Sequence, residues 1–142
     1  GYRGLVMDWP VTYTRKIRYS DTDAQGIVFN ANYARYFDDA LTDLFDLVGY
    51  PWGEVEIVMR RTEIDFHSTA RLGDVLVTGA RVERIGTTSL TMQLATWDEA
   101  SRRTVAEARQ VQVVVSGDDF RPIPVPAELV AAIEAVQGAV ER

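Results

Sequence analysis

The sequence predicts an α+β fold in which an antiparallel sheet of about five strands wraps around one long central helix. Three observations predict it. A long amphipathic helical pattern lies in the first third of the chain, several strand-like segments follow it, and the gaps between these segments have hairpin length, which favours antiparallel pairing. The sequence contains no internal repeat, low-complexity segment or linker, so we expect a single domain over residues 1–142.

The long helix is predicted between about Ala31 and Val48. Apolar residues recur there at intervals of three and four, which is the spacing of one helical face, and aspartates occupy much of the opposite side. Gly49 and Pro51 follow directly and predict the end of the helix. The apolar stripe is wide and rich in aromatic residues, which suits a helix that packs against a broad sheet.

The strands are predicted from segments rich in Val, Ile and Thr, several of which alternate apolar and polar residues. Glycine and aspartate pairs separate them and predict turns. A short helix from Pro126 to about Gln137 closes the chain. The expected strands are Val11–Tyr19, before the long helix, and then Val55–Phe66, Val75–Ile85, Ser89–Trp97 and Thr104–Val115.

Composition excludes several classes of function. The formal net charge of −6 argues against a general nucleic-acid binder. The absence of cysteine excludes disulfides, a thiolate nucleophile and thiolate metal sites, and a single histidine, His67, excludes multi-histidine metal sites. We therefore expect no metal and no cofactor. No run of residues approaches a membrane span and the first ten residues show no export signal, so we expect a cytoplasmic protein.

Residues 19–40, YSDTDAQGIVFNANYARYFDDA, carry the strongest functional signal. A loop containing Gly26 runs directly into the long helix, whose first turn presents unpaired amides and a partial positive charge. Such an amide stabilises the oxyanion that forms when a carbonyl is attacked, by roughly 3–4 kcal/mol for one donor in a dry site. Asn30 lies close to the predicted helix start, and Asp21 and Asp23 are candidates for a general base or a nucleophile.

This stretch resembles the signature of the 4-hydroxybenzoyl-CoA thioesterase family, which includes the related tol-pal-associated acyl-CoA thioesterases. The similarity extends over roughly Val11–Val115. It implies the hotdog fold, a homodimer or homotetramer with active sites at subunit interfaces, and hydrolysis of the thioester of a small or medium acyl-CoA, aromatic ones included, without a cofactor. The matching residues are Tyr19-Ser20-Asp21-Thr22-Asp23, Gly26-Ile27-Val28-Phe29, Asn32-Tyr33 and Arg35-Tyr36.

The resemblance also assigns roles to individual residues. It makes Asp23 the catalytic carboxylate, and it makes the backbone amide of Asn30 the group that polarises the thioester carbonyl. It implicates Tyr19 in catalysis, and it places Gly26 and Asp38 at the substrate, with Asp38 near a polar acyl group. The family carries histidine or tyrosine where this sequence has Asn30. A backbone amide survives that change, whereas an acid–base role for a histidine side chain does not.

Structural alternatives exist for these residues. Asp21 is expected to serve as a turn or cap group rather than as the catalyst. The Asn30 side chain could cap the helix, which does not conflict with the proposed role of its amide. Tyr19 could be a strand aromatic that packs against its neighbours. The sequence leaves open whether Asp23 attacks the carbonyl itself or activates water.

Three other functions are compatible with the same fold. The protein could bind acyl-CoA without hydrolysing it, or it could hydrolyse the thioesters of an acyl carrier protein. A dehydratase or hydratase is the third alternative, but those enzymes typically pair a histidine with an acid, and His67 lies far from the loop in sequence.

Overall fold

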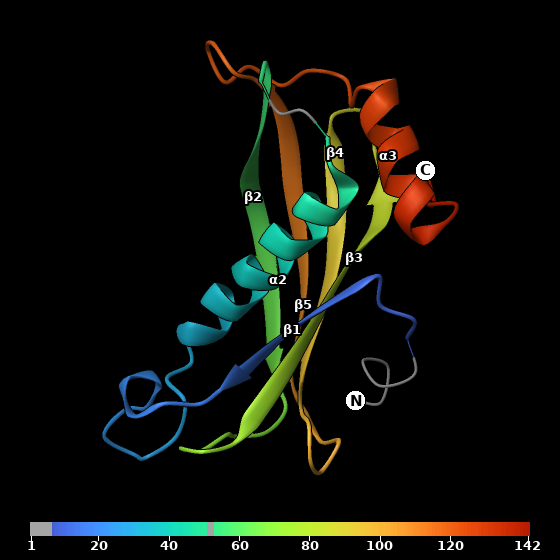
Figure 1. The fold of residues 1–142 in the computed structure, drawn as a ribbon. Coiled ribbons are helices and arrows are strands. Elements are labelled where there is room, and N and C mark those ends of the chain that lie inside the picture. The colour runs from blue at the N-terminus through green and yellow to red at the C-terminus, as the bar shows by residue number, and fades with distance from the viewer. Residues whose placement is uncertain (1–6, 51–52) are drawn as a thin grey trace.

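A five-stranded antiparallel sheet curls around one long helix in the computed structural model, which describes residues 7–50 and 53–142 (Figure 1). The strand order is β1-β3-β4-β5-β2, and each neighbouring pair is antiparallel. This architecture confirms the α+β prediction. The elements in chain order are β1 (Val11–Lys16), the 3₁₀ turn η1 (Tyr19–Asp21), α2 (Asn32–Val48), β2 (Val55–Phe66), β3 (Val75–Ile85), β4 (Ser89–Asp98), β5 (Thr104–Ser116) and α3 (Ala127–Gln137).

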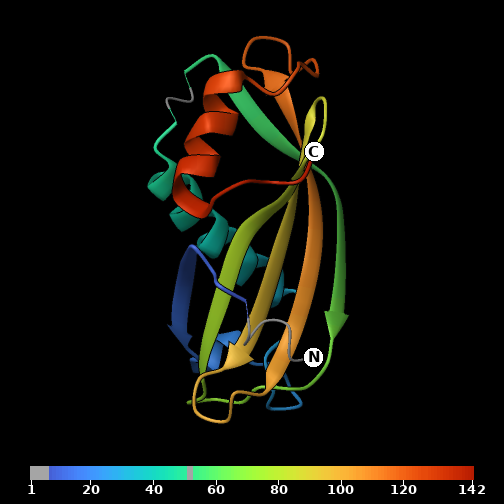
Figure 2. The ribbon, with the colours of Figure 1, turned by 90° about the vertical axis from the view of Figure 1, so that its right-hand side faces the viewer.

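Helix α2 forms the centre of the core. Figure 2 shows α2 and α3 on the same side of the sheet, and the apolar stripe predicted from the sequence is the buried face of α2. The helix ends at Gly49, whose φ of 70° suits glycine and whose N–H donates to the Phe45 carbonyl at 3.0 Å. Pro51, the second predicted stop signal, lies outside the described residues. The buried residues of α2 are Tyr33, Tyr36, Phe37, Ala40, Leu41, Leu44 and Val48.

The first strand is shorter than the sequence predicts. It ends at Lys16, and Tyr19, which was expected inside it, belongs to η1. The cause is a local hydrogen bond, because the Arg18 N–H donates to Asp21 Oδ2 at 2.8 Å and coils the chain where it would otherwise extend. The remaining predicted elements agree with the structure to within one residue at each end.

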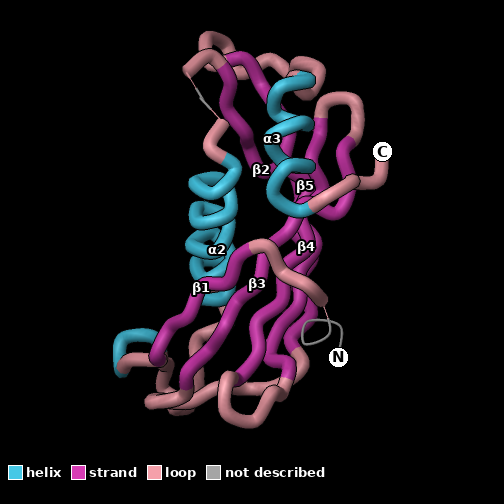
Figure 3. Tube along the Cα trace, turned by 45° about the vertical axis from the view of Figure 1, so that its right-hand side comes forward, coloured by secondary structure: helices cyan, strands magenta, loops and turns pink. Residues whose placement is uncertain are grey.

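Helix α3 is fastened to the sheet by one side chain. Gln137 Nε2 donates to the Val82 carbonyl at 2.7 Å, and Gln137 Oε1 accepts from the Val82 N–H at 3.0 Å. This pair of bonds sits beside a register shift between Val82 and Arg84, where β3 and β4 lose their regular ladder. Figure 3 shows α3 lying against the end of the sheet opposite the loop that precedes α2.

Within residues 7–50 and 53–142, no helix combines the length and the apolar character needed to cross a membrane.

Two leucines on α2 provide a matched test of this core. Leu44 is fully buried, whereas Leu47 is 53% exposed. We expect Leu44→Ala to lower the free energy of unfolding by about 2–5 kcal/mol, because it leaves a cavity in a packed core. Leu47→Ala should change it by less than about 0.5 kcal/mol. Urea unfolding of both variants measures the difference, and equal losses would contradict the described burial.

Candidate active site

The loop before α2 is a tight turn that fixes Asp23 in space. The Asp23 N–H donates to the Ile27 carbonyl at 3.0 Å, and the Gly26 N–H donates back to the Asp23 carbonyl at 2.9 Å. Gly26 adopts a φ of 77°, a left-handed conformation that other residues adopt only with strain. Gly26 therefore shapes the turn that presents Asp23.

The Asp23 carboxylate has one oxygen engaged in the turn. Its Oδ1 accepts from the Gln25 N–H at 2.8 Å, and among the described residues no hydrogen bond reaches Oδ2. The side chain is half-buried, and it lines a concavity of about 470 Å³ together with Tyr19 and Gly26. The structure thus brings three of the predicted site residues to one place. Tyr19 is 83% exposed, so it is not a strand aromatic that packs against its neighbours.

The start of α2 offers the predicted amide donors. The Asn32 N–H donates to the Phe29 carbonyl at 2.9 Å, and the Tyr33 N–H donates to the Asn30 carbonyl at 3.3 Å. The N–H groups of the two preceding residues, Asn30 and Ala31, have no acceptor among the described residues. The N-cap residue is Ala31, with no side-chain cap hydrogen bond, so the Asn30 side chain does not cap the helix. Both amides lie at the positive end of the helix dipole.

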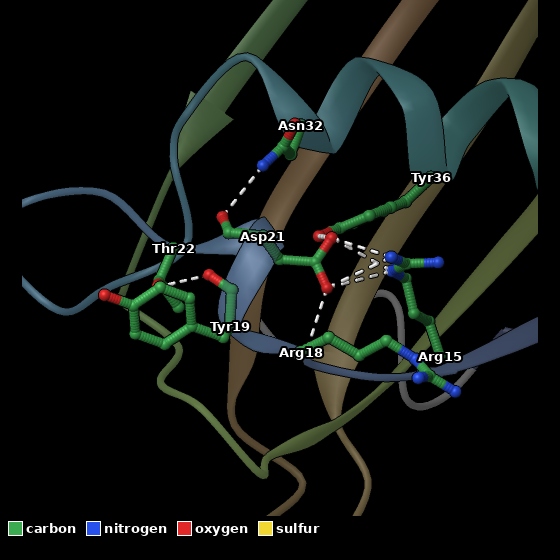
Figure 4. Close-up of polar contacts among 7 residues, drawn as sticks. All are labelled: Arg15, Arg18, Tyr19, Asp21, Thr22, Asn32 and Tyr36. Carbon is green, nitrogen blue, oxygen red and sulfur yellow. Dashed lines mark hydrogen bonds and ion pairs between the residues drawn. The ribbon is translucent and has the colours of Figure 1, made fainter.

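Asp21 is the most heavily bonded side chain of this region (Figure 4). It is 1% exposed, and its carboxylate receives Arg15 Nη2 at 2.8 Å, the Arg18 N–H at 2.8 Å and the Tyr36 hydroxyl at 2.8 Å. Burial alone would raise the pKa of Asp21, but the donors from Arg18, Arg15 and Tyr36 outweigh it and hold the pKa below its ordinary value. These contacts agree with the predicted scaffold role of Asp21.

The same contacts alter the two partner side chains. Hydrogen bonds to Asp21 and Tyr13 raise the pKa of Arg15, so the guanidinium stays charged. Burial and the hydrogen bond to Asp21 raise the pKa of Tyr36, so its hydroxyl stays a donor. The guanidinium also lies 5.4 Å from the centre of the Tyr36 ring. Arg15, Asp21 and Tyr36 therefore form one charge-balanced cluster between β1 and α2.

Sequence reasoning missed the roles of Arg15 and Tyr36, although both carry a signal. On β1 the alternation of side chains places Arg15 on the same face as Val11 and Tyr13, which pack against the core, so an anionic partner was to be expected. Tyr36 lies on the apolar stripe of α2, where a buried phenol normally finds a hydrogen-bond partner. Asp21 satisfies both.

Asp38 lies apart from this loop, two turns further along α2. It lines a cavity of about 540 Å³ between α2 and the edge strand β2. The side chain is exposed, but partial desolvation at the cavity wall and the neighbouring Asp39 carboxylate raise the pKa of Asp38. Both apolar and polar side chains surround the cavity, and its other lining residues are Leu41, Thr42, Phe45, Asp46, Glu56, Ile57 and Gln112.

The single histidine does not join the loop in any described contact. His67 Nε2 lies 3.9 Å from a carboxylate oxygen of Glu107 on β5. Within the part of the chain that the structure describes, no group of three or more His, Asp or Glu side chains could hold a metal ion.

Comparison with known proteins identifies the family of this chain. Residues 17–133 match the sequence model of the Thioesterase-like superfamily, and this range contains the whole of the loop, α2 and four strands. The chain belongs to this superfamily. Membership confirms the predicted family, the hotdog fold and the assignment as a thioester hydrolase.

Individual relatives agree with this membership. The chain is 28% identical over 130 residues to the acyl-CoA thioester hydrolase YbgC of Escherichia coli O6:H1, an alignment that covers 87% of this chain and 92% of that protein. It is 28% identical to a thioesterase from Thermus thermophilus, crystallised with coenzyme A and zinc, with a TM-score of 0.82 and coverage of 92% and 96%. A 1,4-dihydroxy-2-naphthoyl-CoA thioesterase from Synechocystis, at 19% identity and a TM-score of 0.78, covers 87% of this chain and 94% of its own and shares the fold.

The Asp21 cluster predicts an acid-sensitive stability. Because the pKa of Asp21 is lowered on folding, its carboxylate stabilises the fold fully above the unfolded pKa of about 3.9, and this contribution is lost as pH falls through the folded pKa. We expect Asp21→Asn to lower the free energy of unfolding at pH 7 by about 3–5 kcal/mol, because it leaves the Arg15 charge without its partner. The loss should shrink in acid.

Urea unfolding at pH 7, 5 and 3.5 measures both effects. Asp39→Asn, at an exposed position on α2, is the control and should change the stability by less than about 0.5 kcal/mol. A deficit in Asp21→Asn that is the same at all three pH values would contradict the stabilising role of the charged carboxylate.

Proposed function

We propose that the protein hydrolyses acyl-CoA thioesters, with Asp23 as the catalytic carboxylate and the Asn30 amide as the oxyanion donor. One observation supports this proposal most directly. A carboxylate oxygen of Asp23 and the N–H of Asn30, both without a described protein partner, lie on the two sides of one tight loop. The acyl-CoA thioester hydrolase YbgC and the coenzyme A complex of the Thermus enzyme support coenzyme A as the carrier.

The reaction has two forms that this arrangement allows. Asp23 takes a proton from water while the water oxygen attacks the thioester carbon, or the Asp23 carboxylate attacks that carbon and forms a mixed anhydride that water then hydrolyses. In both forms the carbonyl oxygen becomes negative and accepts a hydrogen bond from the Asn30 N–H. The resulting tetrahedral intermediate then re-forms the C=O bond and breaks the C–S bond, which releases coenzyme A.

The leaving group explains why the site functions without a histidine. Coenzyme A departs as a thiolate, and thiols have a pKa near 8.5, far below that of an alcohol. Little protonation by a general acid is therefore needed as the C–S bond breaks. The single histidine, His67, contacts Glu107 of β5 and has no described contact with Asp23, so the loop before α2 contains no histidine–acid pair for a dehydration.

The acyl group is proposed to run along α2 toward Asp38. Asp38 follows the first residue of the helix, Asn32, by six positions, which is about 9 Å along the helix axis. The cavity between α2 and β2 starts there, with the apolar side chains of Leu41, Phe45 and Ile57. A small or medium acyl group, aromatic ones included, that carries a polar substituent suits this lining.

A second copy of the chain is proposed to complete the site. The edge strand β2 extends over 12 residues, and it bears the exposed apolar side chains of Met59 and Phe66. A long edge with exposed apolar residues favours pairing with another strand. We propose a homodimer or homotetramer built on this edge, in which the partner subunit closes the cavity beside β2. The cytoplasmic location stays a prediction.

Asp23→Asn tests the central claim. Asparagine keeps the Oδ1 acceptor for the Gln25 N–H, so the loop should keep its shape while it loses the base or nucleophile. We expect kcat for acyl-CoA hydrolysis to fall by at least about 10³-fold with an unchanged oligomer and melting temperature. A thiol-release assay on a panel of acyl-CoA substrates measures the rate.

The chain provides a control with the same local geometry. Asp119 Oδ1 also accepts from the N–H two residues ahead, that of Arg121, but it lies at the far end of the sheet in an exposed turn. Asp119→Asn should retain the wild-type rate. Wild-type turnover in Asp23→Asn would remove the proposed mechanism. Thioester binding without any thiol release by the wild-type protein would favour the non-catalytic alternative, and release only from an acyl carrier protein would change the carrier.

Asp38 is testable through substrate preference. A carboxylate in the acyl cavity should favour an acyl group that donates a hydrogen bond, so we expect kcat/KM for 4-hydroxybenzoyl-CoA to exceed that for benzoyl-CoA. Asp38→Asn should reduce this ratio by about tenfold, the value of one good hydrogen bond to a charged group. Asp39→Asn, which does not line the cavity, should leave the ratio unchanged. An unaltered ratio in Asp38→Asn would contradict the acyl contact.

A further inference from the structure

One backbone carbonyl closes the loop on which the proposed chemistry depends. The Asp21 carbonyl oxygen accepts two hydrogen bonds, one from the Phe29 N–H at 3.0 Å and one from Asn32 Nδ2 at 2.8 Å. Figure 4 shows the Asn32 side chain reaching from the first residue of α2 back to this carbonyl. The two donors come from either side of Asn30. The loop that begins at Asp21 thus returns to Asp21.

The side chain of Asp21 is also held in place by hydrogen bonds. The Asp21 carboxylate is held by Arg15 from β1, by the Arg18 N–H from the chain before η1 and by the Tyr36 hydroxyl from α2. A charged, hydrogen-bonded group that is 1% exposed has no alternative position with equal pairing. The Asp21 carbonyl is therefore a fixed point of the fold, connected to both the sheet and the helix.

Asp23 and the Asn30 amide are both positioned from this point. Asp23 follows Asp21 by two residues and is held by the turn at Gly26. Asn30 lies between Phe29 and Asn32, the two residues whose donors meet the Asp21 carbonyl. Loss of the Asn32 donor frees the helix side of this closure while the carboxylate cluster stays intact. The separation between the carboxylate and the oxyanion donor would then no longer be fixed.

We propose that Asn32 is a positioning residue for thioester hydrolysis, which sets the Asn30 amide relative to Asp23 by tying the first residue of α2 to the anchored Asp21 carbonyl. This inference rests on the proposed function for its kinetic consequence. Asn32 makes its described side-chain bond to the protein backbone, so its effect on the reaction is indirect.

The proposal predicts a specific kinetic signature for Asn32→Ala. A displacement of about 1 Å between reacting groups can lower a rate by about 10²-fold. We expect kcat to fall by about 10- to 100-fold while KM changes by less than about threefold, because an amide that meets the developing oxyanion acts mainly in the transition state. The measurement is thiol release from the best substrate of the acyl-CoA panel.

Gln137→Ala is the matched control. It removes a hydrogen bond of the same type, from a side-chain amide to a backbone carbonyl, at 2.7 Å and at the opposite end of the sheet, and with it the bond from the Val82 N–H to Gln137 Oε1. We expect it to lower the melting temperature at least as much as Asn32→Ala and to leave kcat unchanged. A general loss of stability cannot produce a pattern in which only Asn32→Ala lowers kcat. Equal effects of the two variants on kcat would overturn the positioning role.

Asn32→Asp separates the hydrogen bond from helix stability. The substitution keeps the size of the side chain and places a carboxylate in the first turn of α2, where the helix dipole favours it. It replaces the donor by an acceptor that faces the Asp21 carbonyl. We expect a melting temperature no lower than that of Asn32→Ala, because the helix dipole favours the carboxylate, together with a fall in kcat at least as large as that of Asn32→Ala. A variant that is both stable and fully active would overturn the proposal.

Amide hydrogen exchange tests the same inference without any turnover. In the wild-type protein the N–H groups of Phe29 and Asp23 are bonded across the loop. Asn32→Ala should accelerate their exchange by about tenfold or more, whereas Gln137→Ala should not. Unchanged exchange in Asn32→Ala would reject the positioning role. If the wild-type protein releases no thiol from any substrate, the proposed function fails, and the exchange rates still decide whether Asn32 fixes the loop.

Discussion

A carboxylate with 1% exposure has to be paired, and in this protein the pairing of Asp21 determines the geometry of the whole region around it. The bond from the Arg18 N–H to Asp21 coils the chain after β1, the ion pair with Arg15 fastens that coil to the sheet, and the bond from Tyr36 fastens it to α2. An ion pair of this kind adds little net stability over an apolar substitute, but the loss of one partner leaves the other charge unpaired, which is strongly destabilising.

The different roles of Asp21 and Asp23 follow from their surroundings. Asp21 has each of its polar atoms engaged by the protein, including the backbone carbonyl, whereas Asp23 keeps one carboxylate oxygen without a described partner. The turn at Gly26 holds Asp23 in a half-buried position beside the start of α2. A fixed residue and an available one, two positions apart, would supply both parts of the proposed site: a rigid frame and a reactive carboxylate.

The sequence predicted the fold because its signals are local. The apolar stripe of α2, the glycine at position 49 and the alternation in the strands each act within a few residues, and the structure confirms them. The end of β1 was predicted wrongly because a side chain, Asp21, competes with the strand for the Arg18 N–H. The strand propensity of a residue does not account for a hydrogen bond between its backbone and a nearby side chain. The candidate site was predicted less completely, for a related reason: the contacts of Arg15, Tyr36 and Asn32 with Asp21 span 6 to 15 residues, so only the folded chain reveals them.

The amide of Asn30, which has no acceptor among the described residues, has a consequence for which substitutions the proposed site tolerates. A backbone N–H is present in every residue type except proline, and among the described non-glycine residues only Arg102 and Phe120 have a positive φ, so the conformation at position 30 restricts side chains little. The group that polarises the carbonyl in the proposed reaction is therefore invisible to a comparison of side chains. A substitution of Asn30 by any residue except proline would therefore keep the proposed donor.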